Sequence, residues 1–440
     1  MPQESVPGDL LPPEASAVMG GPLGRRVSPR QRSLRLLLPV IVAMVVVPMG
    51  AAVLRQGHCI TRGWNGDEQF WRGCFSDLPA QYQLAGLDTG LRGWLSSGRE
   101  PKEMPLLSGL MSLLGGFVPG DGWLDETRWY MLLWAALITA CAAVGVWCVA
   151  RLRSHRLDLA TQLALSPIYV VAALLSADLV VTALVLAAML ARHLRRPAVA
   201  GVLLGLALTG HGWVWIVLVA LVVSARRFAD RAEAVRTALV AVGTAALIAI
   251  GLLVLAPELV TGPTTIWWTE PPGYGSVLLI PDLLGHALPA WAPRVVVGLG
   301  WIGAVVAAVL MAGRAWRPAT WAQVAAFAVP VVALTGAAVP VQASLWVLPL
   351  AIAAGVSWRS HLGFVAVEVI HASALWLYIG AASDADSGLP GAWYAVTVLA
   401  RTITWTFLMW SVWYTPVDNA VADPQAPTVD ELRPQEPVAT

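Results

Sequence analysis

The sequence predicts an all-α, polytopic membrane protein with about twelve transmembrane helices. Of its 440 residues, 57% are hydrophobic and only 12% are charged, and the mean hydropathy is +0.67. Soluble globular domains carry roughly 25% charged residues. The apolar residues also come in blocks of about 15–25, the length that crosses a bilayer as a helix. This composition excludes a cytosolic enzyme, a secreted disulfide scaffold and a disordered protein.

The net charge of +1 comes from 28 Lys and Arg against 27 Asp and Glu. This balance gives no reason to expect a nucleic-acid partner. The chain holds 22 tryptophans, which fit an aromatic belt at the membrane interface. Stacking on sugars or lipid head groups is the alternative role for some of them.

Both ends of the chain have the composition of disordered cytoplasmic tails. Residues 1–33 are rich in Pro, Gly and Ser and turn basic before the first apolar stretch, and residues 415–440 are Pro-rich and acidic. The stretch 35–54 is too long and too far from the start for a typical signal peptide, so it is the first predicted span. Positive charge before it places the N-terminus inside. Residues 34–414 form the predicted transmembrane domain.

A polar segment, 55–127, follows the first span. Within it, 104–118 is apolar but short and rich in glycine. If this stretch crossed the membrane, the basic cluster 151–156 would lie outside, against the positive-inside rule. The sequence therefore predicts a re-entrant or interfacial helix at 104–118, within an outer loop.

The remaining predicted spans alternate across the membrane and leave a second outer loop at 257–293. The basic clusters around 192–196, 226–236, 314–317 and 359–361 then fall on the cytoplasmic side. We expect a multi-pass plasma-membrane protein with both termini cytoplasmic and an extracytoplasmic active face. The spans are 128–150, 158–176, 178–192, 197–208, 211–225, 234–256, 294–313, 319–336, 343–357, 361–382 and 391–414.

Two short motifs resemble sites found in soluble enzymes. Gly298, Gly300 and Gly303 match a dinucleotide fingerprint, but they lie within a span without the strand–turn–helix context that the fingerprint requires. Close helix packing explains them better. Asp384 and Asp386 form a D-x-D in a short outer turn, where a solvated loop is the simpler interpretation. The sequence shows no metal cluster and calls for no cofactor.

The four cysteines fall into two pairs. Cys59 and Cys74 lie in the outer loop, where an oxidising environment favours a disulfide; two free thiols are the alternative. Cys141 and Cys148 are seven residues apart on one helix face, where a packing role is expected.

Ionisable residues inside a membrane are functional candidates by default. Glu368 and His371 share a helix face and fit a buried hydrogen-bonded pair. Arg401 is their candidate partner, or a contact for a lipid phosphate. Asp178 and His211 lie near the outer ends of short spans, where they would line a cavity.

Several segments together resemble the actinobacterial integral-membrane mannosyltransferases that depend on polyprenol-phosphate-mannose, within the glycosyltransferase-C superfamily. The resemblance covers residues 35–414. The segments that carry it are Cys74-Phe-Ser-Asp77-Leu-Pro-Ala-Gln-Tyr82, Glu103-Met-Pro-Leu-Leu-Ser-Gly109, Leu175-Ser-Ala-Asp178-Leu179, Pro197 to Leu206, Trp267-Trp268, Gln342-Ala-Ser-Leu-Trp346-Val-Leu-Pro349-Leu350 and Glu368 to Tyr378.

The resemblance implies a transferase that moves a sugar, mannose or another pentose or hexose, from a polyprenyl-phosphate donor to a glycan or glycolipid acceptor of the cell envelope. It places Asp77 at the position of the general base, which takes the proton of the acceptor hydroxyl. Membrane lipids surround the site. The candidate substrate-binding residues are Glu103, Asp178, His211, Trp267, Trp268, Gln342, Glu368, His371 and Arg401.

A second hypothesis is a non-catalytic relative of this fold, acting as a lipid-binding or assembly subunit with a membrane-protein partner. Two lysines of the resembled family are replaced here, within Gly210-His211-Gly212-Trp213-Val214 and within Ala337 to Ala343. A transporter is a third hypothesis, for which the sequence lacks an internal repeat.

Overall fold

The computed structural model describes residues 31–415 except 97, 99, 121, 226–230, 314–317 and 385. The predicted tails, 1–33 and 415–440, therefore lie almost wholly outside the described residues. The side chains of residues 31–36, 83, 267 and 268 also lie outside them. Every regular element in the described part of the chain is a helix, and none is a strand.

Within the described part of the chain, six helical segments are long and apolar enough to cross a membrane, which identifies the chain as a helical membrane protein. The first runs through α2 and α3, which are separated by a turn at residues 44 and 45. The segments are Leu37–Arg55 in α2 (Gln31–Ala43) and α3 (Val46–Arg55), α9 (Trp123–Leu152), α15 (Arg231–Leu255), α18 (Trp291–Gly313), α21 (Trp358–Gly380) and α22 (Gly391–Tyr414).

Shorter apolar helices fill the interior of the bundle. Many of their side chains are fully buried, most of all in α12 and α20. These helices are α10 (Leu157–Ala164), α11 (Ile168–Ala172), α12 (Asp178–His193), α13 (Pro197–Leu208), α14 (Val214–Ser224), α19 (Trp321–Leu334), η4 (Val341–Ala343) and α20 (Ser344–Ala354).

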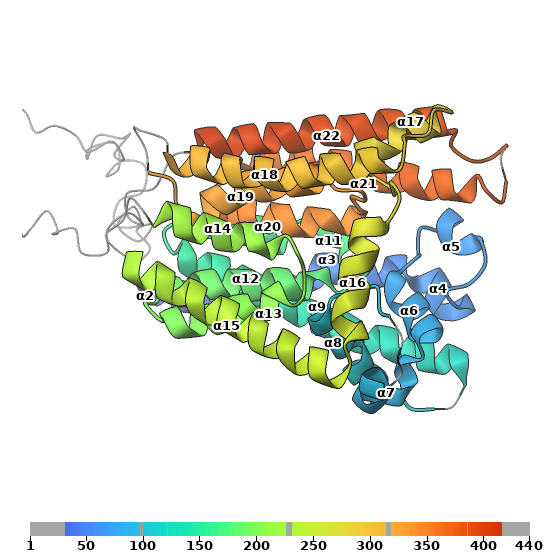
Figure 1. Ribbon diagram of the computed structural model, residues 1–440, viewed down its shortest axis with the longest axis horizontal. Coiled ribbons are helices and arrows are strands. Elements are labelled where there is room, and N and C mark those ends of the chain that lie inside the picture. The colour runs from blue at the N-terminus through green and yellow to red at the C-terminus, as the bar shows by residue number, and fades with distance from the viewer. Residues whose placement is uncertain are drawn as a thin grey trace, which may run out of the picture.

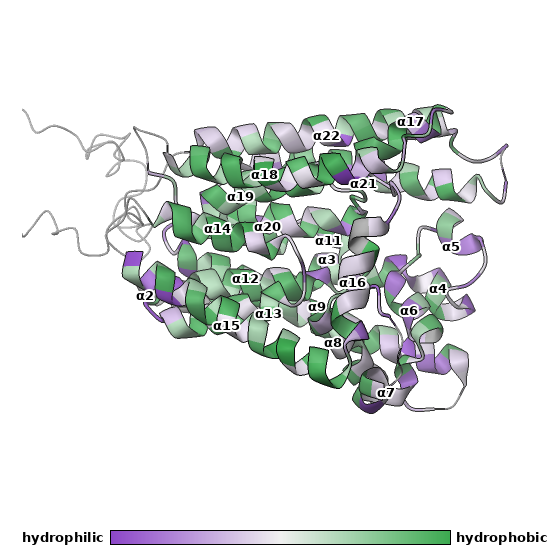
Figure 2. Ribbon diagram, in the orientation of Figure 1, coloured by the Kyte–Doolittle hydropathy of each residue, from purple (hydrophilic) through white to green (hydrophobic). Residues whose placement is uncertain are grey.

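The long and short helices run side by side along the length of the molecule (Figure 1). α12 packs between α9 and α13, α19 packs between α18 and α20, and α21 packs on α22. The helices within residues 57–115 and 258–283 gather at one end, which we call the loop end (Figure 1), and several of them are more polar than the rest of the bundle (Figure 2). They are α4 (Gly57–Arg62), α5 (Glu68–Trp71), α6 (Asp77–Ala85), η2 (Leu87–Thr89), α7 (Gly90–Ser96), α8 (Pro105–Gly115), α16 (Glu258–Thr269), η3 (Val277–Leu279) and α17 (Ile280–Leu283).

All twelve predicted spans coincide with helical segments, and six of them satisfy the length and hydropathy of a membrane-crossing helix. Crossing by the six shorter ones stays a prediction. The stretch 104–118 contains α8, whose 11 residues extend only about 16 Å at 1.5 Å per residue. A hydrocarbon core is about 30 Å thick, so α8 by itself cannot span it.

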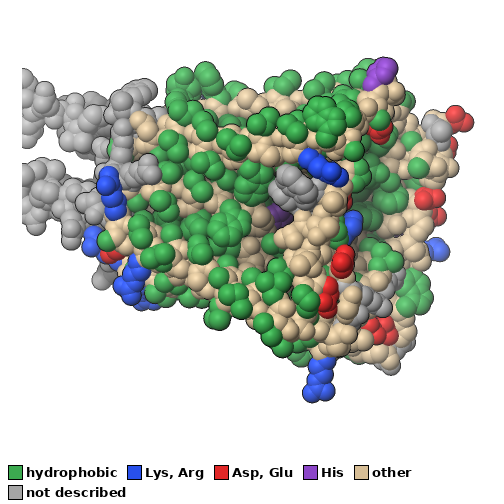
Figure 3. Space-filling view, viewed as in Figure 1, with side chains coloured by type: hydrophobic (Ala, Val, Ile, Leu, Met, Phe, Trp, Pro, Cys, Tyr) green, Lys and Arg blue, Asp and Glu red, His purple; other side chains and the backbone are tan. Residues whose placement is uncertain are grey.

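Charge is distributed unevenly between the two ends. Figure 3 shows one group of Lys and Arg side chains at the end opposite the loop end, whereas most visible Asp and Glu side chains lie toward the loop end, together with several further Lys and Arg side chains. We call the opposite end the basic end. The connections at the basic end carry Arg151, Arg153, His155, Arg156, Arg192, Arg195, Arg196 and Arg359.

The glycine triplet 298–303 lies within α18 and serves helix packing. A Cβ built on Gly300 would lie 1.7 Å from the Oγ1 atom of Thr335, near the end of α19. Only glycine permits this approach of α18 to α19. The packing interpretation is confirmed for Gly300, whereas a Cβ on Gly298 would meet nothing within 4 Å, and no strand precedes these glycines as a dinucleotide site would require.

Candidate functional site

Asp77 is the first residue of α6, and the start of that helix is attached to the turn before α12. Ser76 caps α6 by accepting a hydrogen bond from the Leu78 N–H at 3.3 Å, and its own hydroxyl donates to the Leu174 carbonyl at 2.6 Å. The Asp77 N–H donates to the Leu175 carbonyl at 2.9 Å. These bonds fix the Asp77 backbone beside the N-terminus of α12.

Asp178 is the first residue of α12, so both aspartates begin helices at neighbouring points. A carboxylate in the first turn interacts favourably with the helix dipole. The Ser176 hydroxyl donates to Asp178 Oδ2 at 2.7 Å, and the Asp178 side chain is 8% exposed. The two helix starts therefore bring carboxylates from distant parts of the sequence to the same region.

Glu103 adds a third carboxylate, just before α8. The Leu106 N–H in the first turn of α8 donates to the Thr209 carbonyl at 3.0 Å, which attaches α8 to the turn between α13 and α14. Gln81 of α6 donates from Nε2 to Glu103 Oε1 at 3.1 Å. Glu103 is thus held between α6 and the α13–α14 turn.

The α13–α14 turn contributes His211 to this group. Its Nε2 lies 3.7 Å from Asp178 Oδ1, and its ring lies against the Trp346 indole with centroids 4.3 Å apart. Gln342 of η4 also contacts this group, because its Nε2 donates to Asp77 Oδ2 in a long hydrogen bond of 3.5 Å. We call Asp77, Glu103, Asp178, His211 and Gln342 the carboxylate cluster.

Burial and mutual repulsion hold the carboxyls of Asp77 and Glu103 closer to the neutral form. Burial raises the pKa of Asp77 to about 7 from 3.8, and the nearby Glu103 and Asp178 charges add to the increase. Lys102 and the Gln342 amide act in the opposite direction. The pKa of Glu103 is also raised, first by burial and then by Asp178.

This geometry suits proton transfer more than metal binding. A carboxyl with a pKa near 7 accepts a proton efficiently at neutral pH while still being substantially ionised. Asp77 and Gln342 are both partly exposed, so a ligand can approach them. Among the described residues, no group of three His, Cys, Asp or Glu side chains is arranged to hold a metal ion.

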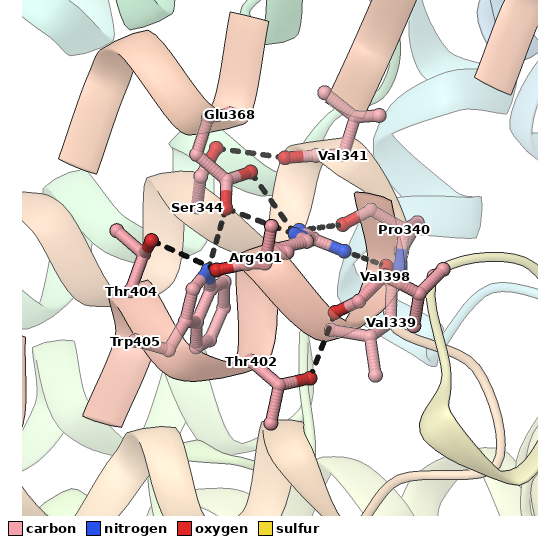
Figure 4. A network of polar contacts seen from close by, with 12 residues as sticks. Val339, Pro340, Val341, Ser344, Glu368, Val398, Arg401, Thr402, Thr404 and Trp405 are labelled. Carbon is pink, nitrogen blue, oxygen red and sulfur yellow. Dashed lines mark hydrogen bonds and ion pairs between the residues drawn. The ribbon is translucent and has the colours of Figure 1, made fainter. Parts of the chain in front are cut away.

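Two of the other candidate residues, Glu368 of α21 and Arg401 of α22, form a separate, fully buried network (Figure 4). Arg401 Nε donates to both Glu368 oxygens, at 2.9 and 3.2 Å, and Trp405 Nε1 donates to Glu368 Oε1 at 2.5 Å. The two remaining guanidinium nitrogens donate to the carbonyls of Val339 and Pro340. Each guanidinium nitrogen of Arg401 therefore has an acceptor within the protein.

The predicted pair between Glu368 and His371 is wrong. Glu368 bonds to Arg401 and Trp405, and neither ring nitrogen of the buried His371 has a hydrogen-bond partner. The His371 ring instead stacks on Tyr394 with centroids 5.6 Å apart. An i, i+3 spacing places two residues on one helix face, but the arginine on the next helix is a stronger partner for a buried carboxylate.

The structure thus divides the predicted site residues into two groups. Asp77, Glu103, Asp178, His211 and Gln342 come together, whereas Glu368 and Arg401 lie in the buried network. His371 is buried against Tyr394 and has no hydrogen bond to this network among the described residues. The side chains of Trp267 and Trp268, in α16, lie outside the described residues.

Three further features of the site were not among the site residues predicted from the sequence. Gln81 contacts Glu103 from the next turn of α6, a position that helical spacing from Asp77 could have indicated. Trp346 contacts His211 only through tertiary packing, for which the sequence has no local signal. The network also holds the 339–340 backbone that precedes Gln342.

The predicted disulfide between Cys59 and Cys74 is confirmed, and Cys74 lies three residues before Asp77.

The D-x-D motif lies in a turn in which Asp384 and Asp386 are both exposed. The Asp386 N–H donates to Asp384 Oδ1 at 3.2 Å. Exposure of both carboxylates agrees with a solvated turn.

Comparison of the chain with protein families, with curated proteins and with solved structures finds no match to any of them.

Proposed function

We propose that this protein is a membrane glycosyltransferase that uses a polyprenyl-phosphate sugar as donor and a glycan or glycolipid of the cell envelope as acceptor. The observation that supports this function is the meeting of Asp77, Glu103 and Asp178 at the loop end, with a pKa of about 7 for Asp77. The resemblance of segments within residues 35–414 to polyprenol-phosphate-mannose-dependent transferases supplies the substrate class.

In the proposed reaction, an acceptor hydroxyl attacks the anomeric carbon of the donor sugar. The new glycosidic C–O bond forms, the bond from the anomeric carbon to the phosphate oxygen breaks, and polyprenyl phosphate leaves with the bonding electrons. Asp77 takes the hydroxyl proton, which makes the attacking oxygen more nucleophilic. Gln342 orients the carboxylate through its amide, and burial, together with the Glu103 and Asp178 charges, keeps the pKa of Asp77 near neutrality.

The charge distribution supports an orientation for this chemistry. Arginines gather at the basic end, and connections on the cytoplasmic side of membrane proteins are enriched in Lys and Arg. The basic end would then be cytoplasmic and the carboxylate cluster extracytoplasmic. Lipid-linked sugars are donors suited to that side, because the polyprenyl chain anchors them in the membrane.

The function is tested with Asp77→Asn in a strain that lacks the chromosomal gene, with envelope glycolipids as the readout. Loss of a general base typically lowers the rate about 10²–10⁴-fold, so the variant should fail to restore the wild-type glycolipid profile. Asp88→Asn is the matched control, because Asp88 is an exposed carboxylate on the neighbouring η2 helix. Membrane levels of each variant are measured in parallel.

Full complementation by Asp77→Asn, with normal glycolipids, would overturn the enzymatic proposal. That outcome favours the second hypothesis, a non-catalytic subunit that binds lipid or a membrane-protein partner. Failure of Asp77→Asn together with normal function of Asp88→Asn would place the base at Asp77.

A further inference from the structure

Arg55 is a largely buried cation whose charge has no carboxylate partner among the described residues. It is the last residue of α3, at the loop end of the first membrane-crossing segment. Its Nη1 donates to the Gly73 carbonyl at 2.7 Å. Its Nε and Nη2 atoms are buried and have no hydrogen-bond partner within the described part of the chain.

Arg128, which contacts the same part of the chain, has a hydrogen-bond acceptor for each of its guanidinium nitrogens. Arg128 of α9 donates from Nε to the Ile60 carbonyl at 2.6 Å and from Nη2 to the Thr61 carbonyl at 3.0 Å. Its Nη1 pairs with Asp125 at 2.8 Å. Arg128 and Arg55 both hold backbone of the 57–73 segment, but only Arg128 has a counter-ion.

The free atoms of Arg55 define the chemistry of the missing partner. Nε and Nη2 form one edge of the guanidinium, with two parallel N–H groups that match two oxygens of a phosphate or carboxylate. A buried charge left unpaired is costly, whereas a bidentate anion compensates it. The edge therefore calls for an oxyanion.

The surroundings favour an anion carried by a lipid. On α3 the residue next to Arg55, Leu54, is 81% exposed, and Val46 and Val47 are 62% and 67% exposed. In a membrane-crossing segment such side chains face the acyl chains. A lipid lying along this face of α3 would bring its phosphate to the level of Arg55.

The position of Arg55 also connects it to the carboxylate cluster. Its partner Gly73 is four residues before Asp77, and four residues span at most about 14 Å. The backbone bond to Gly73, the adjacent Cys59–Cys74 disulfide and the cap of α6 keep this distance fixed.

We propose that Arg55 is the anchor of a lipid-phosphate site at the loop end of α3. The inference rests on the proposed function only where it identifies this phosphate with that of the sugar donor. In that case the guanidinium stabilises the negative charge that develops on the leaving phosphate. The binding site itself requires no transfer reaction.

The test measures binding of radiolabelled farnesyl phosphate to the purified full-length protein, with no acceptor present. We expect Arg55→Gln to weaken binding about 10- to 100-fold, as for loss of hydrogen bonds to a charged group. Arg55→Lys should fall in between, because an ammonium keeps the charge but lacks the planar edge. Arg128→Gln should bind as the wild type does. Equal binding by Arg55→Gln and Arg128→Gln would overturn the proposal.

Competition with unlabelled compounds identifies the source of the phosphate. Farnesol should not compete, because it lacks the anion, and competition by farnesol equal to that by farnesyl phosphate would overturn the proposal. Competition by phosphatidylglycerol assigns the site to lipid head groups in general, and its absence assigns the site to prenyl phosphates; either supports a lipid phosphate. Displacement by inorganic phosphate as effective as by farnesyl phosphate would overturn the lipid assignment.

A photoreactive farnesyl phosphate provides a measurement on the wild-type protein, which covers the case in which Arg55→Gln does not fold. Crosslinks should map to peptides containing residues 46–56 or 70–76, and crosslinks confined to other peptides would overturn the site. Binding that depends on Arg55 in a protein that transfers no sugar would refute the proposed function and leave this inference standing.

Discussion

At the residue scale, the proposed catalytic role of Asp77 and the stability of the fold have opposite requirements. Burial and the neighbouring Glu103 and Asp178 charges raise the pKa of Asp77, which favours proton transfer near neutral pH. The same repulsion makes the ionised carboxylate unfavourable in the folded chain. Stored electrostatic strain of this kind is common at functional sites.

We predict that Asp77→Asn is more thermally stable than the wild type at pH 8. The folded pKa is about 7 and the ordinary value is 3.8, so the folded state binds the proton more tightly than the unfolded state. Stability from this group is therefore present at low pH and is lost as the pH rises from about 4 to about 7. The side-chain amide of the Asp77→Asn variant does not ionise, so the variant does not lose this stability as the pH rises.

The measurement is the Tm of both purified proteins as a function of pH. The difference in Tm should be large at pH 8 and shrink as the pH falls through 7, and it should level off only below the ordinary pKa of 3.8, where the wild-type carboxyl becomes protonated in both states. Asp88→Asn, an exposed control, should show no such trend. A pH-independent difference for Asp77→Asn would contradict the raised pKa.

Gln342→Leu should move the acidic limb of the activity–pH profile to higher pH. The Gln342 amide donates to Asp77 Oδ2 and stabilises the ionised form, so its removal raises the pKa of Asp77 further. The bond is long, at 3.5 Å, and we expect a change of less than about one pH unit. The charged groups facing Asp77 are Glu103, Asp178 and Lys102.

Gln81→Leu is the matched control for Gln342→Leu. Gln81 donates to Glu103 rather than to Asp77, and it lowers the pKa of Glu103. Its loss makes Glu103 less charged, which reduces the repulsion on Asp77. An upward displacement of the profile by both variants would show that the effect is not specific to the Gln342 bond.

At the element scale, the pair of α21 and α22 holds the backbone that leads into η4. Arg401 bonds to the Val339 and Pro340 carbonyls, and the Val339 N–H donates to the Tyr274 carbonyl at 3.1 Å. η4 then presents Gln342 to Asp77. A buried ion pair between two long helices thereby sets the geometry of a short helix at the site.

Arg401→Gln should destabilise the protein by about 3–5 kcal/mol, because it leaves the fully buried Glu368 carboxylate without its counter-ion. Replacing both partners, as in Arg401→Met with Glu368→Leu, should recover most of that stability. The double variant still lacks the bonds to the 339–340 carbonyls, so we expect reduced activity and the same pH displacement as in Gln342→Leu.

Thermal unfolding and activity are measured on the same preparations. Arg156→Gln is the control, since Arg156 pairs with Asp158 at an exposed position, 38% and 47% exposed. Its loss should cost less than about 1 kcal/mol. A stable double variant with wild-type activity and pH profile would show that the network does not position Gln342.

At the scale of the whole molecule, the alternating helices and the uneven charge predict the topology. Single cysteines at Asn65, Gly122 and Pro272 should react with an impermeant maleimide in intact cells. The connections at the basic end should react only after permeabilisation, tested with cysteines at His155, Asp230 and Trp316. Reaction of a cysteine at the His155 position in intact cells would contradict the predicted topology.

The sequence alone determined the membrane class and the positions of the helical segments, because hydropathy over about twenty residues is a local property. It also indicated the disulfide between Cys59 and Cys74, which closes a short loop. The packing role of Gly300 in α18 was correctly assigned, since the context of the motif within a span is itself local.

Only the tertiary structure decided which polar side chains meet. Asp77 and Asp178 are about a hundred residues apart in the sequence. They come together because the Ser76 hydroxyl and the Asp77 N–H donate to the Leu174 and Leu175 carbonyls, just before α12. Glu368 pairs with Arg401 instead of His371 because the contact crosses from α21 to α22. Side-chain pairing in a membrane bundle depends on how helices pack against one another, and hydropathy along the chain carries no record of that packing.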